Sequence, residues 1–114
     1  FETFDLAVKK YPDAHPLFHS DRGFQYTSKQ FKAKLDKQQM KQSMSRVGRC
    51  IDNGPMEGFW GILKCEMYYL NHFDTYEKLV EAVEKFIHYY NHQRRQHKLN
   101  CLPPATYRSL LEAA

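Results

Sequence analysis

The sequence predicts a small, helix-rich α/β fold whose short strands pair in parallel. Short apolar runs alternate with segments whose apolar residues recur every three or four positions, in the order helix, strand, helix, strand, helix, helix. The chain has 114 residues, of which 42% are hydrophobic and 15% aromatic, enough for one small domain with a core.

The first predicted helix covers residues 1–10, where apolar side chains recur at helical spacing, and it ends before Pro12. Residues 16–20 form an apolar run too short for a helix, which favours a buried strand. A polar turn, Asp21–Gly23, follows, so Asp21 stands at the carboxyl end of that strand.

The next helix is predicted over residues 27–39. Thr27 and Gln30 have the spacing of a capping box, which predicts that the helix begins at Thr27. Residues 41–45 are expected to form the second strand, and residues 46–50 a mobile loop.

Two longer helices are expected in the second half. Asp52 or Asn53 is a suitable cap for the first of these helices, since both side chains can accept a backbone N–H of the first turn. Pro55 is tolerated in that first turn. Another helix is expected from Asp74 to Asn91, and a short one after Pro104. The first helix carries a predicted buried stripe of Met56, Phe59, Trp60, Leu63, Met67 and Leu70.

We therefore expect one partial domain over residues 1–114. Residues 1–11 would end a first helix, residues 16–70 would form the carboxylate-bearing core, and residues 74–114 would form the C-terminal helices. Because two short strands alone make a marginal sheet, we expect further strands to precede residue 1.

Charge is unevenly distributed along the chain, whose net charge is +4. Residues 27–50 carry seven cations and one anion, Asp36, whereas the segment from Glu66 to Glu84 is acidic. The basic segment is compatible with phosphate binding and equally with a solvated lysine-rich helix face.

Several classes of protein are disfavoured by composition. No run approaches the roughly 20 apolar residues needed to cross a bilayer, so no membrane association is expected. Three widely spaced cysteines indicate neither a disulfide framework nor a zinc knuckle. His88 and His92, read with His97 or Cys101, lack the ligands that would complete a zinc site.

Two carboxylates stand out. Asp21 ends a strand and Glu57 lies early in a helix, with 35 residues between them. Taken singly, each carboxylate is more typical of a helix cap or a surface charge than of a catalytic group. Lys64 lies seven positions after Glu57, which places both on one helix face.

The flanking residues resemble a known family. Residues 19–28, HSDRGFQYTS, resemble the second-aspartate motif of insertion-sequence DDE transposases, relatives of the retroviral integrases. SMSR at 43–46 and EGFW at 57–60 resemble the catalytic-glutamate segment, and the 35-residue spacing is also typical of the family. Its C-terminal signature is matched by Tyr89, Tyr90, Asn91, Arg94, Gln96, Leu99, Pro104, Tyr107 and Arg108.

This resemblance implies a ribonuclease-H-like integrase core, truncated so that its first three strands are absent. Asp21 and Glu57 would be catalytic metal ligands for Mg²⁺ or Mn²⁺ in a two-metal site, because strand transfer displaces one phosphodiester oxygen by another. The family's first aspartate has no counterpart among Asp5 and Asp13, so we expect the chain alone to be inactive.

The resemblance also implies transposon-end and target DNA as partners, in the bacterial cytoplasm, and an exposed strand edge favours a homo-oligomer. The DNA contacts would come from Lys64, Arg22, Arg46, Arg49, Asn53 and Arg94. The alternative is a non-catalytic DNA-binding or self-associating module that uses residues 29–49. A ribonuclease-H-like nuclease outside transposition is disfavoured by the C-terminal signature.

Overall fold

The computed structural model describes residues 1–114 and divides them into two compact units, Phe1–Gly58 and Phe59–Ala114. Each unit has its own cluster of buried hydrophobic side chains. No helix in the structure combines the length and apolar character needed to cross a bilayer.

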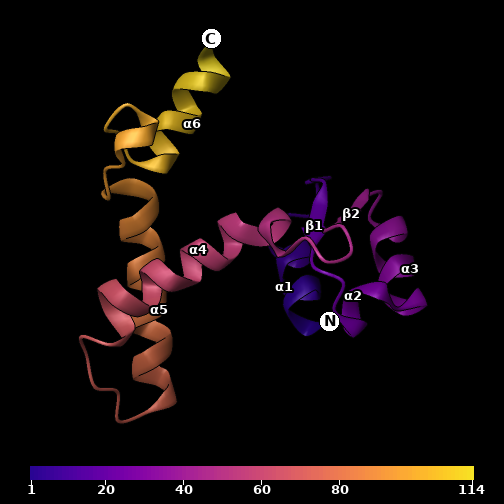
Figure 1. The fold of residues 1–114 in the computed structure, drawn as a ribbon, viewed down its shortest axis with the longest axis horizontal. Helices are drawn as coiled ribbons and strands as arrows, with labels where there is room; N and C mark the ends of the chain where they lie inside the picture. The colour runs from indigo at the N-terminus through magenta and orange to yellow at the C-terminus, as the bar shows by residue number, and fades with distance from the viewer. The chain divides into compact units, whose positions relative to one another are not determined.

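The first unit alternates helices and strands as the sequence predicts (Figure 1). Its α/β character and its small sheet are therefore confirmed. Its elements are α1 (Glu2–Lys10), β1 (Phe18–Ser20), α2 (Phe24–Thr27), α3 (Lys29–Lys37) and β2 (Gln42–Met44), then a 3₁₀ turn (Cys50–Asn53) and the start of α4 (Gly54–Leu63).

The two strands pair in parallel, as predicted, with Phe18 opposite Gln42 and Ser20 opposite Met44. The backbone N–H of Ser45 donates to the Ser20 carbonyl at 2.9 Å, which extends the ladder past the end of β2. Parallel strands end at the same edge of a sheet. The residues after β1 and after β2 therefore meet at that edge.

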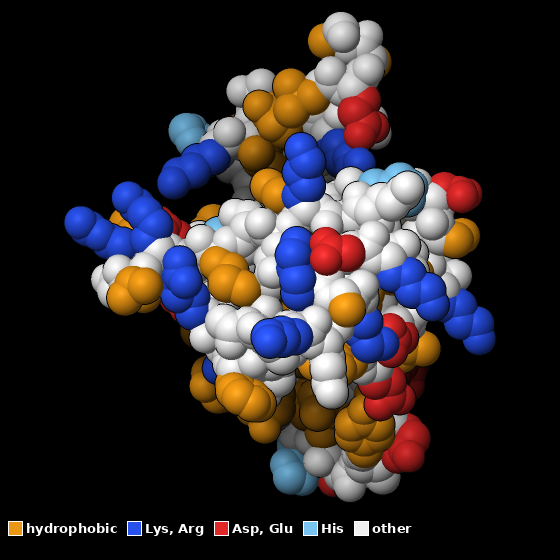
Figure 2. All heavy atoms as spheres, turned by 90° about the vertical axis from the view of Figure 1, so that its right-hand side faces the viewer, with side chains coloured by type: hydrophobic (Ala, Val, Ile, Leu, Met, Phe, Trp, Pro, Cys, Tyr) orange, Lys and Arg blue, Asp and Glu red, His pale blue; other side chains and the backbone are white.

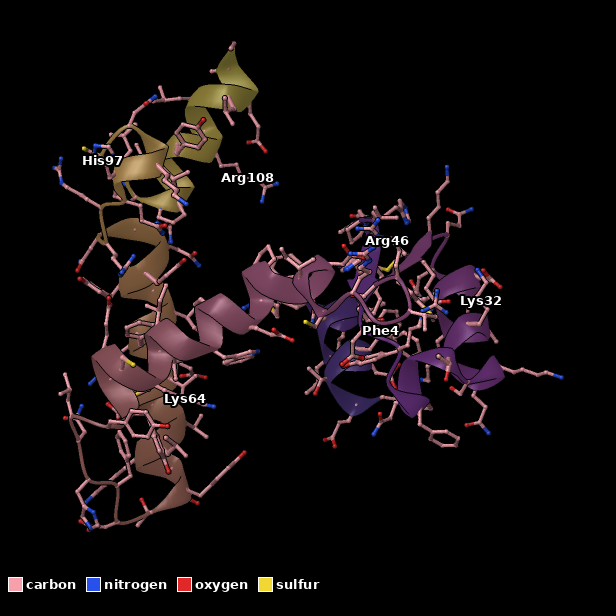
Figure 3. The ribbon with its side chains drawn as sticks, in the orientation of Figure 1. Phe4, Lys32, Arg46, Lys64, His97 and Arg108 are labelled. Carbon is pink, nitrogen blue, oxygen red and sulfur yellow. The ribbon has the colours of Figure 1, made fainter.

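An aromatic core holds β1 against the helices of the first unit. Phe31 and Leu35 of α3 are almost fully buried. The ring of Phe4 in α1, labelled in Figure 3, lies in the first unit. Its centroid is 6.1 Å from that of Phe18 in β1, and the Phe18 centroid is 5.1 Å from that of Phe31. Edge-on aromatic contacts of this kind add to the stabilisation from burial, so the position of β1 is well determined by packing.

The start of α3 differs from the prediction. Ser28, not Thr27, is the N-cap, and its hydroxyl accepts the Phe31 N–H at 3.1 Å. The Thr27 hydroxyl donates instead to the Phe24 carbonyl at 3.2 Å, within the short helix α2, which the sequence did not reveal. A four-residue helix contains too little of the apolar repeat to be recognised.

The second unit contains the end of α4, a π-helical turn (Lys64–Tyr68), α5 (Tyr76–His92), a 3₁₀ turn (His97–Leu99) and α6 (Pro104–Ala113). The predicted helix to Leu70 is therefore interrupted: the Tyr69 N–H donates to the Lys64 carbonyl at 2.8 Å, a spacing of five residues. Helix α5 is capped by Thr75, whose hydroxyl accepts the Lys78 N–H at 3.2 Å, rather than by Asp74.

Only part of the predicted apolar stripe is buried. Leu63 and Met67 pack with Phe86 of α5 to form the core of the second unit. Trp60 and Leu70 are 46% and 73% exposed. The α-helical repeat breaks at the π-helical turn, so Leu70 leaves the face that the repeat predicts for it.

Candidate functional site

The first candidate residue, Asp21, follows directly after β1. Its Oδ1 accepts the backbone N–H of Gly23 at 2.8 Å, which fixes the carboxylate above the turn. A Cβ at position 23 would lie 2.9 Å from that same oxygen. Glycine is therefore the residue that leaves Asp21 in this position, and the Asp21 side chain stays exposed.

Glu57 lies in the first turn of α4 and is also exposed. Neither Glu57 nor Asp21 takes part in an ion pair within the chain. Both carboxylates are therefore available to a cation from outside the protein.

The two carboxylates line the same cavity, of about 490 Å³, although 35 residues separate them in sequence. The cavity lies at the edge where β1 and β2 end. All the predicted site residues of the first unit contribute to its wall, which comprises Asp21, Arg22, Ser45, Arg46, Val47, Gly48, Arg49, Cys50, Asn53 and Glu57.

The loop after β2 forms one side of this cavity. Gly48 has φ of +69°, a left-handed conformation that other residues rarely adopt. The Arg49 N–H donates to the Arg46 carbonyl at 3.1 Å, which closes the turn. Arg49 makes no ion pair, so its charge is free on the cavity wall.

Arg22 and Arg46 are held by the protein itself. Arg22 Nε donates to the Ser45 carbonyl at 2.7 Å. Arg46 donates to Asp52 through its backbone N–H, Nε and Nη2, at 2.9, 3.0 and 2.9 Å. Hydrogen bonds from Arg46 hold the pKa of the Asp52 carboxyl well below its usual range.

The sequence predicts Asp52 or Asn53 as the cap of α4, and of these two residues Asp52 is engaged elsewhere. Its carboxylate binds Arg46 instead, and its backbone lies in the 3₁₀ turn that leads into α4. The sequence contains no periodic signal for this pair, because a loop and a turn separate Arg46 from Asp52.

The remaining predicted site residues, Lys64 and Arg94, belong to the second unit. Lys64 begins the π-helical turn (Figure 3). Arg94 forms a forked ion pair with Glu66, with Nη2 2.7 Å from Oε1, and its guanidinium lies over the Tyr90 ring at 5.5 Å. Hydrogen bonding between the two groups lowers the pKa of Glu66 and raises that of Arg94.

Basic side chains are also paired elsewhere on the surface. Lys34 binds both carboxylate oxygens of Asp5 at 2.7 Å, and Lys32 lies 3.0 Å from Asp36. Figure 2 shows the Lys and Arg side chains of one face projecting separately, several of them beside acidic groups. The basic segment 27–50 therefore presents less free positive charge than its composition predicts.

Some of the side-chain oxygens on the cavity wall are suitable ligands for a hard divalent cation. Asp21 and Glu57 offer carboxylate oxygens and Asn53 an amide oxygen, the ligand types that Mg²⁺ and Mn²⁺ prefer. The structure contains no group of three or more His, Cys, Asp or Glu side chains placed to hold a metal ion. The carboxylates on the cavity wall are those of Asp21 and Glu57.

Comparisons with known proteins agree with these motifs. Residues 57–110 match the integrase core domain family. The chain is 45% identical over 103 residues to an uncharacterized transposase-like protein of Haemophilus influenzae, covering 90% of this chain and 48% of that protein. It is 44% identical over 106 residues to the putative transposase InsK for insertion sequence element IS150 of Escherichia coli, covering 92% and 38%.

A third relative is the uncharacterized 31 kDa protein of insertion element IS600 from Shigella sonnei, 39% identical over 98 residues, which cover 85% of this chain and 36% of that protein. The chain spans about half or less of the length of these curated relatives. No solved structure matches it. The chain belongs to the integrase-core family of insertion-sequence transposases.

Proposed function

We propose that this chain carries part of the catalytic edge of a DDE transposase, which cuts and joins DNA strands with the help of divalent metal ions. One observation carries the proposal: the end of β1 and the first turn of α4 bring Asp21 and Glu57 to one cavity. Similarity to transposases over 90% of the chain supports it.

In this proposal Asp21 and Glu57 are metal ligands for Mg²⁺ or Mn²⁺ in a two-metal site. When bound, the metal pair would stabilise the attacking and leaving oxygens of a phosphodiester exchange. The contribution of the chain is to orient ligands. The Gly23 N–H holds Asp21 Oδ1, and the start of α4 presents Glu57 to the same cavity.

DNA would be the substrate. Arg49, whose charge is free, is the strongest candidate on the cavity wall for a phosphate contact. Asn53 and the unbonded side of the Arg22 guanidinium are further candidates there. Roles for Arg46, Lys64 and Arg94 toward DNA stay predictions, and Asp52 and Glu66 already neutralise the two arginines.

We further propose that β1 and β2 belong to a larger, ribonuclease-H-like sheet. A two-stranded sheet is marginal alone, and an apolar cavity of about 600 Å³ opens beside β1, lined partly by Phe4, Phe18 and Phe31. The free edge of β1 also favours a homo-oligomer. We expect a protein with such a DNA substrate to act in the bacterial cytoplasm.

A Mn²⁺ titration of the purified chain, followed by electron paramagnetic resonance, tests the proposed site. We expect binding that is lost in both Asp21→Asn and Glu57→Gln. The matched control is Asp36→Asn, which removes a carboxylate from α3 and should leave binding unchanged. Equal binding by all four proteins would contradict a metal site at the cavity.

DNA-binding measurements on the same proteins, with Mn²⁺ and with a chelator, distinguish this proposal from the alternative. The alternative is a DNA-binding or self-associating module without catalysis. Such a module would bind duplex DNA with equal affinity in the presence of Mn²⁺ or a chelator. It would also be indifferent to Asp21→Asn. The pairing of Lys34 with Asp5 and of Lys32 with Asp36 makes the module less favourable, because it reduces the charge available to phosphate.

A further inference from the structure

A continuous set of hydrogen bonds joins the segment that carries Asp21 to the segment that carries Glu57. It begins at Arg22, the neighbour of Asp21, whose Nε donates to the Ser45 carbonyl at 2.7 Å. Ser45 is 5% exposed, and its N–H donates back to the Ser20 carbonyl at 2.9 Å. The end of β2 is thereby fastened to the end of β1 on both sides of Asp21.

The second half of the set begins at Arg46, the next residue after Ser45. Its backbone N–H and Nε both donate to Asp52 Oδ2, and its Nη2 donates to Oδ1. Both carboxylate oxygens of Asp52 are therefore used by one arginine. The Asp52 side chain is 20% exposed, against 72% for Arg46, so the acceptor is the more enclosed partner.

The contact between Arg46 and Asp52 also restrains the backbone that leads to Glu57. Asp52 lies in the 3₁₀ turn Cys50–Asn53, which continues without a break into α4, where Glu57 occupies the first turn. Helical backbone is stiff over so few residues because each turn is closed by its own hydrogen bonds. Fixing Asp52 against Arg46 therefore fixes where α4 begins.

We propose that Asp52 is a positioning residue that, with Arg22, Ser45 and Arg46, sets the separation of Asp21 and Glu57. We call these four residues the arginine link. The inference rests on the proposed function, and it assigns Arg46 to holding the site rather than to binding DNA phosphate. Bidentate bonding by arginine is geometrically strict, which suits a link that must define a distance.

The test compares Asp52→Ala and Arg46→Ala, singly and together, with the unmodified chain. We expect each single change to raise the Mn²⁺ dissociation constant about tenfold, as loss of a residue supporting a metal ligand typically does. The double variant should be no worse than either single one, because both changes break the same contact. Asp52→Asn, which keeps an acceptor for the Arg46 N–H, should lie between Asp52→Ala and the unmodified chain.

Urea unfolding and amide hydrogen exchange are measured on the same proteins. A positioning role predicts faster amide exchange in residues 46–57 with little change in residues 29–37. It also predicts that the free energy of Mn²⁺ binding falls by more than the free energy of unfolding. Asp36→Ala is the control, since it breaks the exposed Lys32–Asp36 pair on α3 and should alter neither metal affinity nor exchange in residues 46–57.

Two results would overturn the inference. One is unchanged exchange in residues 46–57 of Asp52→Ala. The other is unchanged Mn²⁺ affinity in that variant when Asp21→Asn abolishes binding. If the unmodified chain binds no Mn²⁺, the proposed metal site fails by itself, and exchange in residues 46–57 still decides whether the arginine link exists.

Discussion

At the scale of single residues, the space at Gly23 governs the position of Asp21. A Cβ added at Gly23 would lie 2.9 Å from Asp21 Oδ1, the one carboxylate oxygen that the backbone holds. The φ of Gly23 is −54°, which any residue can adopt. The requirement for glycine here is therefore one of space at the site and not of backbone conformation.

We predict that Gly23→Ala moves the Asp21 carboxylate and weakens Mn²⁺ binding about tenfold, by analogy with other supporting residues of metal sites. The matched control is Gly58→Ala in α4, where an added Cβ meets nothing within 4 Å. That change should stabilise the helix by roughly 0.5–1 kcal/mol. Equal Mn²⁺ affinities for Gly23→Ala and the unmodified chain would count against this account of Asp21.

Residue roles could be predicted from the sequence only where a motif carried them. Asp21 and Glu57 are predicted to be metal ligands because motif and spacing agree. The structure places both on one cavity, and their role as ligands stays a prediction. The bonds of Asp52 to Arg46 were missed, because a contact across a loop leaves no periodic pattern. Which cations are free also depends on partners such as Asp5, 29 residues from Lys34.

At the scale of elements, caps decide where the helices begin. Ser28 and Thr75 each accept a backbone N–H of the first turn, for α3 and α5 respectively. Both lie one residue after the position that the sequence predicts. The pattern of apolar residues locates a helix well but leaves its first residue open, because neighbouring polar residues are equally suitable caps.

We predict that Ser28→Ala lowers the free energy of unfolding by about 1 kcal/mol, the usual effect of losing an N-cap. Thr27→Ala is the matched control. Its hydroxyl donates to the Phe24 and Gly23 carbonyls at 3.2 and 3.4 Å, and its loss should cost clearly less. Urea denaturation checks both, and a larger loss for Thr27→Ala would show that Thr27 is the cap.

Glu66 of the π-helical turn forms an ion pair with Arg94, and this pair predicts a pH dependence. Arg94 lowers the folded-state pKa of Glu66 below its ordinary 4.5. The pair therefore stabilises the fold above that pH, and the contribution is lost as the pH falls through the folded-state pKa.

Arg94→Ala should reduce stability at neutral pH and remove the part of the acid-induced loss that is due to Glu66. Denaturation at neutral and at successively lower pH measures the difference between the variant and the unmodified chain. That difference should shrink as the pH falls below 4.5. A difference that is constant over this range would contradict an ionic role for the pair.

At the scale of the whole chain, each unit has its own core. Phe31, Leu35 and Met40 form one cluster, whereas Leu63, Met67 and Phe86 form the other. A single partial domain over residues 1–114 stays a prediction. Apolar repeats in the sequence reveal which faces are buried but not which faces share a core. The parallel pairing of β1 and β2 was predictable from the alternation of elements, and it is confirmed.

We predict that Leu35→Ala, at a fully buried position, costs about 2–5 kcal/mol and is felt first in residues 1–58. Phe86→Ala is the matched change in the other core and should affect residues 59–114 first. Amide hydrogen exchange resolves the two. Equal loss of protection in both units from either change would contradict separate cores.

The central claim is that Asp21 and Glu57 both contribute ligands to the same metal site. Paramagnetic broadening by Mn²⁺ in the amide spectrum of the chain tests it most directly, since broadening falls steeply with distance from the ion. We predict that signals of residues 21–23 and 53–58 broaden together at low Mn²⁺ and that signals of residues 29–37 do not. Glu57→Gln should abolish the broadening of both segments. Broadening of either segment alone, or of neither, would contradict the claim.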